Sequence, residues 1–193
     1  GDRLCRDLAR DHFGVGTTLS AHSSARSVLT AVQEGIATVG VLPIPEDSEE
    51  EAWWPALAGI SSRKNMSICA RLPFSPSTIG NDEAALCVAS IEPAESGDDR
   101  TFFFFQTPPE ISRARLNDSI SAAGIKPIRL IGLDSPIDGM SAFLSEVKGF
   151  VCPDDPRIAR LVDKEIGLAE SAFFLGVYAT PLTIDDVADG EEV

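Results

Sequence analysis

Apolar and polar positions alternate most regularly between residues 99 and 181. Four dense apolar runs there have the length and the β-branched or aromatic content of buried strands. These predicted strands are 101–106, 128–133, 140–150 and 173–178. Between them, apolar residues at helical spacing predict a helix that begins at Pro108–Glu110 and another that begins at 153–156 and continues through Ile166. The predicted order is βαββαβ, the ferredoxin-like arrangement.

The chain before residue 92 has a weaker alternation, which predicts an α/β lobe. Helical spacing of apolar residues predicts helices at 2–13, at 24–33 and around 53–57. Apolar runs predict strands at 37–43, 65–72 and 84–91, and a short polar stretch, 17–21, is a further strand candidate. The run 37–43 is nearly continuous, which is typical of parallel sheets, and ligands gather at the carboxyl ends of such strands. We therefore expect a site near the loop Pro43–Ser48.

A polar stretch rich in turn formers, 92–99, separates the two patterns. It predicts a linker between the α/β lobe, at 2–91, and the βαββαβ unit, at 99–181. Residues 182–193 end in Asp-Gly-Glu-Glu-Val, which predicts a flexible acidic tail. The proline-, serine- and glycine-rich stretch 73–82 predicts an exposed loop.

Charge narrows the range of partners. Acidic residues outnumber basic ones by 30 to 16, and the formal net charge is −14. Such a surface repels phosphate backbones and anionic lipid heads, so we expect no nucleic-acid partner and no membrane partner. The sequence has neither a membrane-spanning apolar run nor a signal-peptide pattern, and we expect a cytoplasmic protein. Because it starts at Gly1 with a helix, we also expect a further segment before that residue.

The cysteines and histidines predict no metal site and no cofactor. None of Cys5, Cys69, Cys87 and Cys152 has CxxC spacing, and three of them lie in apolar segments. Buried thiols in a reducing compartment are therefore favoured over disulfides or metal ligands. His12 and His22 have no cysteine or acidic partner at ligand spacing.

Five segments resemble the prephenate dehydratase family. Residues 31–48 are similar to its pattern AV-x-x-G-x-A-x-x-GV-x-PIENS, and 97–102 to the N-x-TRF strand that leads into its regulatory ACT domain. Residues 109–112 stand where that family has PGAL, while 154–157 match DDPR and 175–178 match LGSY. The resemblance implies a truncated periplasmic-binding-like α/β lobe followed by a ferredoxin-like βαββαβ ACT domain.

The chain also departs from that family where catalysis would occur. The family's opening GTFS strand would precede residue 1, and its second lobe with a TSTA-type threonine is missing between Ser48 and Asp98. An aromatising dehydration needs a proton donor and cations that hold two carboxylates in an enclosed cleft. We expect no dehydratase activity; Arg100 and Thr101, at the TRF-like positions, are the catalytic candidates that remain. The cations Arg63, Lys64 and Arg71 are outside the family pattern.

The resemblance implies two regions that bind an aromatic amino acid, phenylalanine above all. They comprise Pro109, Glu110, Ile111 and Ser112 in the first, and Leu133, Asp134, Ser135 and Pro136 in the second. Backbone N–H groups at a helix start suit a carboxylate, and Asp134 suits an ammonium group. Glu110 replaces a glycine and adds a negative charge, so a domain retained only for dimerisation stays an alternative.

Two functional hypotheses follow. The first is a non-catalytic regulatory and dimerisation module of phenylalanine biosynthesis, forming a homodimer through its ACT domain. The alternative is part of a chorismate mutase/prephenate dehydratase enzyme that converts prephenate to phenylpyruvate. A mutase domain would lie before Gly1, because this chain has no long amphipathic helix with inward arginine and lysine residues.

Four other patterns have a functional and a structural interpretation. The acidic run 46–51 could bind a divalent metal, but it lacks EF-hand spacing and reads as a solvated run. Trp53–Trp54 is interpreted as a core wedge rather than a ligand lid, and the phenylalanine run 102–105 as residues buried on alternate faces. Ser20, His22 and Asp11 have the chemistry of a triad, but the sequence does not bring them together and has no nucleophile elbow.

Overall fold

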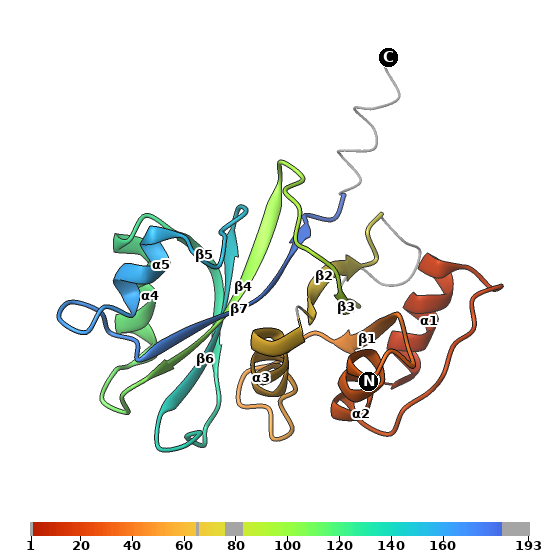
Figure 1. Cartoon of the computed structure of the whole chain (residues 1–193), viewed down its shortest axis with the longest axis horizontal. Coiled ribbons are helices and arrows are strands. Elements are labelled where there is room, and N and C mark those ends of the chain that lie inside the picture. The colour runs from red at the N-terminus through yellow and green to blue at the C-terminus, as the bar shows by residue number, and fades with distance from the viewer. Residues whose placement is uncertain (1, 65, 76–82, 183–193) are drawn as a thin grey trace, which may run out of the picture.

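The computed structural model describes residues 2–64, 66–75 and 83–182 (Figure 1). Its strands are β1 (Val39–Pro43), β2 (Met66–Leu72), β3 (Ala85–Ser90), β4 (Asp99–Thr107), β5 (Lys126–Gly132), β6 (Ser141–Lys148) and β7 (Ser171–Ala179). Its helices are α1 (Asp2–Phe13), α2 (Ala25–Gln33), α3 (Trp54–Lys64), α4 (Arg113–Ala122) and α5 (Pro156–Leu161). All of these strands form one sheet, in the order β1-β3-β2-β7-β4-β6-β5.

The βαββαβ order predicted for the second half is confirmed. The elements follow as β4, α4, β5, β6, α5 and β7, and the four strands lie in the order β7-β4-β6-β5 with antiparallel neighbours. Helices α4 and α5 lie together on one side of these strands (Figure 1). They cover a core that includes Phe103 and Phe105 of β4.

Both helices of this half differ from the predicted bounds. Helix α4 begins at Arg113, because Ser112 is its N-cap and accepts a hydrogen bond from the Arg115 N–H group. Residues 108–111 form a turn instead, closed by a bond from Ile111 N–H to the Pro108 carbonyl. Helix α5 ends at Leu161, since the Asp163 carboxylate accepts the N–H groups of the two residues at 165 and 166 and turns the chain away.

Two predictions for the first half are wrong: the strand at 17–21 and the parallel orientation of the strand at 37–43. Residues 17–21 are a loop between α1 and α2 rather than a strand, because Thr17 bonds back to the end of α1, its hydroxyl to the Phe13 carbonyl at 2.7 Å and its N–H to Gly14. Strand β1 is antiparallel to β3 and lies at the sheet edge, not in a parallel sheet. The other helices and strands predicted there are present.

The two halves of the sheet meet where β2 and β7 run parallel, with Ile68 opposite Gly176. Gly176 has φ +140°, and a Cβ atom at this position would collide with the Ile68 backbone. We call this contact the seam. Residues 92–98 are exposed and irregular, in keeping with the expected linker, while the sheet continues through the seam. The division at 91 and 99 stays a prediction, and most of the predicted loop and tail, 76–82 and 183–193, is outside the described residues.

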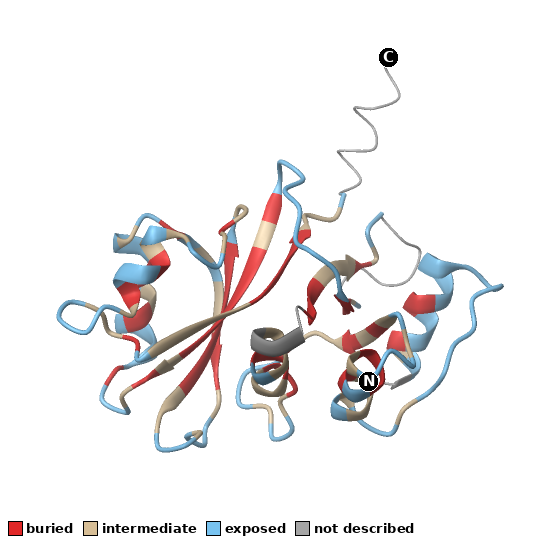
Figure 2. Cartoon of the chain, viewed as in Figure 1, coloured by how far each residue is buried: buried red, intermediate tan, exposed pale blue. Residues whose placement is uncertain are grey.

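Buried residues are concentrated in the strands of the sheet (Figure 2), and all four phenylalanines of 102–105 are buried, on alternate faces as expected. Phe102 and Phe104 pack with α2 and α3 on one face, whereas Phe103 and Phe105 pack under α4 and α5 on the other. Trp53 and Trp54 are both fully buried against the first of these faces, which supports their interpretation as core residues. Trp54 meets Phe104 edge-on, with ring centroids 5.3 Å apart.

Candidate functional site

The loop after β1 crosses to the second half of the molecule and binds the ends of α4 and β5. The Asp47 carboxylate accepts two hydrogen bonds of 2.7 Å from the Arg113 guanidinium and one of 2.9 Å from the Gly132 N–H group. The Ser48 hydroxyl donates to the Asp134 carboxylate at 2.6 Å, and Ser48 N–H donates to the Gly132 carbonyl at 3.0 Å. We call these five residues the Asp47 junction.

Electrostatics keep the Asp47 carboxyl group ionised. The Arg113 guanidinium, followed by the Gly132 N–H group, lowers the pKa of Asp47 below its ordinary value. Both ends of the bidentate pair are 45% exposed, so water screens it. The junction therefore binds a carboxylate at a defined position that remains accessible to solvent.

The junction is where the two predicted effector regions come together. Arg113 follows the first region directly, and Asp134 belongs to the second. Within the first region Ser112 caps α4, Ile111 is buried in the core, and Pro109 and Glu110 are exposed.

In the second predicted effector region, 133–136, the Leu133 backbone and the Asp134 carboxylate are hydrogen-bonded. Leu133 N–H donates to the Ala142 carbonyl, while Ser135 and Pro136 are exposed. The sequence predicted Asp134 and a site near the loop Pro43–Ser48, but not the role of Arg113. The structure brings this loop into contact with the residues predicted to bind an effector, since Ser48 donates to Asp134.

The two catalytic candidates have structural partners. The Thr101 hydroxyl is buried, donates to the Gly149 carbonyl at 2.7 Å and accepts from the Val151 N–H group at 3.1 Å. Arg100 pairs with the buried Glu146 at 3.3 Å. The Thr101 hydroxyl is therefore occupied by backbone groups, and one nitrogen of the Arg100 guanidinium is occupied by Glu146.

Glu146 is the centre of a polar network inside the sheet face. The Tyr178 hydroxyl donates to it at 2.5 Å, from the strand on the other side of β4. Burial, and then the negative charge of Glu146, raises the pKa of Tyr178 well above its ordinary value. Arg71 and Arg100 act in the opposite direction on the same phenol. Of the cations considered for substrate binding, Arg100 is thus bonded into this network through Glu146.

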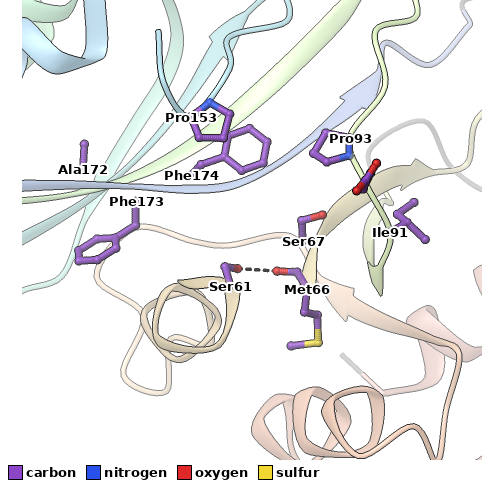
Figure 3. Close-up of a pocket in the computed structure, with 10 residues that line it drawn as sticks. Ser61, Met66, Ser67, Ile91, Pro93, Pro153, Ala172, Phe173 and Phe174 are labelled. Atoms are coloured by element: carbon purple, nitrogen blue, oxygen red, sulfur yellow. Dashed lines mark hydrogen bonds between the residues drawn. The ribbon is translucent and has the colours of Figure 1, made fainter. Parts of the chain in front are cut away.

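An open cavity of about 440 Å³ lies at the seam (Figure 3). Its walls are mostly apolar and come from β2, β7, the linker and the segment before α5. Phe173 and Phe174 leave β7 towards opposite sides, and Glu92 is the charged residue in the lining. The Ser61 hydroxyl donates a hydrogen bond of 2.5 Å to the Met66 carbonyl. This cavity has room for a small apolar group but brings together no nucleophile and base.

The cysteines and the acidic run have no geometry for a metal centre in the described parts of the chain, where no group of three or more histidine, cysteine or acidic residues is arranged to hold an ion. Burial raises the pKa of the Cys69 thiol to about 11 and that of Cys87 to about 12. The acidic run is less solvated than predicted, because Asp47 is held in the junction and burial raises the pKa of Glu49. No described helix has the length and apolar content to cross a bilayer.

Comparisons with known proteins identify relatives by structure alone. No protein-family model matches the sequence, and no curated protein matches it significantly. One similar structure is GqqA, described as a novel type of quorum quenching acylase, with a TM-score of 0.64, 18% identity and coverage of 92% of this chain and 89% of that one.

Two others are prephenate dehydratases. The one from Arthrobacter aurescens, solved in complex with L-Phe, has a TM-score of 0.60, 14% identity and coverage of 97% of this chain and 93% of that one. The one from Streptococcus mutans has a TM-score of 0.54, 14% identity and coverage of 84% and 85%. At these identities the likeness concerns the fold: the chain has a prephenate dehydratase-like mixed α/β fold with a single seven-stranded sheet.

Proposed function

We propose that this chain is a regulatory module of aromatic amino-acid biosynthesis, without dehydratase activity, whose βαββαβ half is an ACT domain. In this proposal an aromatic amino acid, with phenylalanine as the first candidate, binds at the Asp47 junction and shifts an allosteric equilibrium. A homodimer, a cytoplasmic location and a link to chorismate mutase belong to the same hypothesis. The fold shared with a dehydratase solved with L-Phe supports it.

One observation carries the proposal: the junction already holds the carboxylate of Asp47, and the neighbouring residue Ser48 is hydrogen-bonded to a second acid, Asp134. Arg113 and the Gly132 N–H group bind the carboxylate of Asp47, while Asp134 accepts a hydrogen bond from Ser48. An amino-acid zwitterion offers the same two groups, a carboxylate for Arg113 and an ammonium donor for Asp134. Ligand binding would then displace Asp47 and Ser48, and release the loop after β1 from the second half.

The alternative, an active prephenate dehydratase, has less support in the geometry. A dehydratase needs a proton donor beside the leaving hydroxyl. The Thr101 hydroxyl is buried and bonded to backbone groups, and Arg100 is engaged by Glu146. We expect no formation of phenylpyruvate from prephenate in a coupled assay; turnover above the blank would favour the alternative.

Calorimetric titration with phenylalanine, tyrosine, tryptophan and prephenate tests the proposal. We expect an aromatic amino acid to bind and phenylalaninamide, which lacks the carboxylate, not to bind. Asp134→Asn should weaken binding about tenfold, which corresponds to about 1.4 kcal/mol for the loss of one charge-assisted contact. Asp138→Asn is the matched control, because Asp138 is an exposed acid in the same turn. If none of the three amino acids gives a heat of binding, the βαββαβ half has no effector site and serves only in assembly.

A further inference from the structure

A cavity of about 730 Å³ lies along the open edge of β1, between α1, α2 and the loop that joins them. Its lining contains Arg6, Arg10, Phe13, Leu19, Ser20, His22, Ile36 and residues of β1. None of the residues in the Asp47 junction belongs to it. The volume is in the range that small-molecule sites occupy.

The joining loop brings a nucleophile and a base together in this cavity. Ser20 Oγ and His22 Nε2 are 3.2 Å apart. In the tautomer that carries its proton on Nδ1, the imidazole accepts a hydrogen bond from the serine hydroxyl, which is the arrangement that activates serine for attack. Asp11, the third residue with triad chemistry, has no hydrogen bond to either of them among the described contacts. The structure thus supplies a dyad.

The rest of the lining suits an acyl group. Arg6 and Arg10 come from α1 and supply positive charge to the cavity of a chain whose net charge is −14. Cationic donors of this kind stabilise the oxyanion that forms when a carbonyl is attacked. Phe13, Leu19 and Ile36 are 37%, 38% and 73% exposed, so an acyl chain that covers them would remove apolar surface from water.

We propose that this cavity is an acyl-transfer site, in which Ser20 is the nucleophile and His22 the general base, and that its substrates are esters of medium-length aliphatic acids. Ser20 Oγ forms a bond to the carbonyl carbon while His22 Nε2 takes the hydroxyl proton. The tetrahedral adduct collapses, the bond to the alcohol breaks, and the alcohol leaves with the proton from His22. Water, deprotonated by His22, then attacks the acyl–Ser20 ester; the bond between Ser20 Oγ and the acyl carbon breaks, His22 returns the proton to Ser20 Oγ, and the acid is released.

Hydrolysis of 4-nitrophenyl butyrate and octanoate by the full chain tests this site. We expect release of 4-nitrophenolate, together with a mass increase of one acyl group that peptide mapping locates on Ser20. Octanoate should react faster than butyrate, because the longer chain covers more of the apolar wall. His22→Gln should lower the rate about 100-fold, the size of a general-base contribution.

Two serine variants separate chemistry from folding. Ser20→Ala should abolish both the acyl adduct and the rate above that of free imidazole in buffer. Ser23→Ala, an exposed serine near Ser20 in the chain, should keep both. Circular dichroism checks that each variant is folded. A folded Ser20→Ala variant with unchanged rate, or an adduct on another residue, would overturn the proposal, and neither result depends on amino-acid binding at the Asp47 junction.

Discussion

Glu146 shows how a single carboxylate is kept inside this sheet. It has two partners, the Arg100 guanidinium from the adjacent strand β4 and the Tyr178 hydroxyl from β7, on the other side of β4. A buried carboxylate is costly unless its oxygens are bonded, and here a neutral phenol and a cation share that role. The network therefore stabilises the protein only while the phenol stays protonated.

We predict that Tyr178→Phe lowers the free energy of unfolding by about 1–3 kcal/mol at neutral pH, since a buried acceptor loses its donor. The variant should also change the pH dependence. Folding raises the pKa of Tyr178, so its contribution is fully present below the unfolded value near 10 and decreases as the pH rises above it. Denaturant unfolding at several pH values from 7 to 11 should show a loss above pH 10 in the natural protein that is smaller in Tyr178→Phe. Equal slopes would mean that the phenol does not titrate with folding.

Glu110 is the residue that opposes ligand binding in the proposed effector site. It is exposed in the turn before α4, and its charge would repel the carboxylate of an incoming amino acid. We predict that Glu110→Gly tightens phenylalanine binding about tenfold, or about 1.4 kcal/mol, in calorimetric titration. Glu110→Gln separates the two causes, because it removes the charge but keeps the side chain. No change in either variant would count against a ligand at this turn.

At the scale of elements, Asp47 and Ser48 at the tip of the loop after β1 are tied to α4 and β5 by polar contacts, whereas Ile44 and Ala52 on either side of the tip pack against the core. The Asp47–Arg113 pair has good bidentate geometry but is screened, and such pairs contribute at most about 1 kcal/mol. The contacts of the tip can therefore be broken at small cost, which a ligand could supply.

We predict that Asp47→Asn speeds hydrogen exchange of the Gly132 amide and lowers stability by less than about 1 kcal/mol. The natural protein should lose the same contact on acidification, because the pKa of Asp47 is lowered in the folded state and its stabilising effect disappears as the pH falls through that value. Exchange measured by NMR, with Leu133 N–H as an internal control bonded to a carbonyl, tests this. Unchanged exchange at Gly132 would show that the loop is held by something else.

The sequence predicted the elements of the second half well, because its strands are long, apolar and close together. It placed the start of α4 too early, since proline and glutamate at 108–110 fit a helix start as well as a turn. It also predicted a strand at 17–21, where the residues suit a strand but do not pair with any strand of the described sheet.

The candidate site was visible only in part. Asp134 lies in a region that the family resemblance implies for effector binding. Asp47 and Arg113, by contrast, are 66 residues apart and meet only through the tertiary fold. The proximity of Ser20 and His22 also depends on the conformation of a loop, which apolar periodicity does not encode.

At the scale of the whole molecule, the sheet has two edges, β1 and β5. The β5 edge carries Ile128, which is 43% exposed, and an open edge with an apolar residue can pair with a second copy. The proposed homodimer would use this edge, next to the α4 and β5 ends that form the Asp47 junction.

We predict a dimer by light scattering at micromolar concentration, and a monomer for Ile128→Lys. Ile166→Lys is the control, because Ile166 is 72% exposed but lies outside the sheet. A natural protein that scatters as a monomer well above micromolar concentration would exclude dimerisation through β5 at working concentrations.

We predict that adding one methyl group at Gly176, in the seam, strongly lowers the free energy of unfolding. Gly176→Ala places a Cβ atom against the Ile68 backbone at φ +140° and should cost about 3 kcal/mol or more. Gly97→Ala is the matched control: its φ of +102° is also positive, but a Cβ there meets nothing within 4 Å, so it should carry strain alone. Chemical denaturation of both variants gives the difference. A difference of less than about 1 kcal/mol would mean that β2 and β7 can separate without loss.

The same glycine restricts how this architecture can vary. Any sequence that keeps β2 beside β7 needs a residue without a Cβ atom at position 176. The linker is less restricted, because residues 92–98 are exposed and its hydrogen bonds are concentrated at Ser96–Asp98, beside the start of β4. Recombination that exchanges one half of the chain for another should therefore tolerate new linkers but fail with any other residue at the seam. A library of such chimaeras, sorted for folded protein, would be enriched in glycine at this one position.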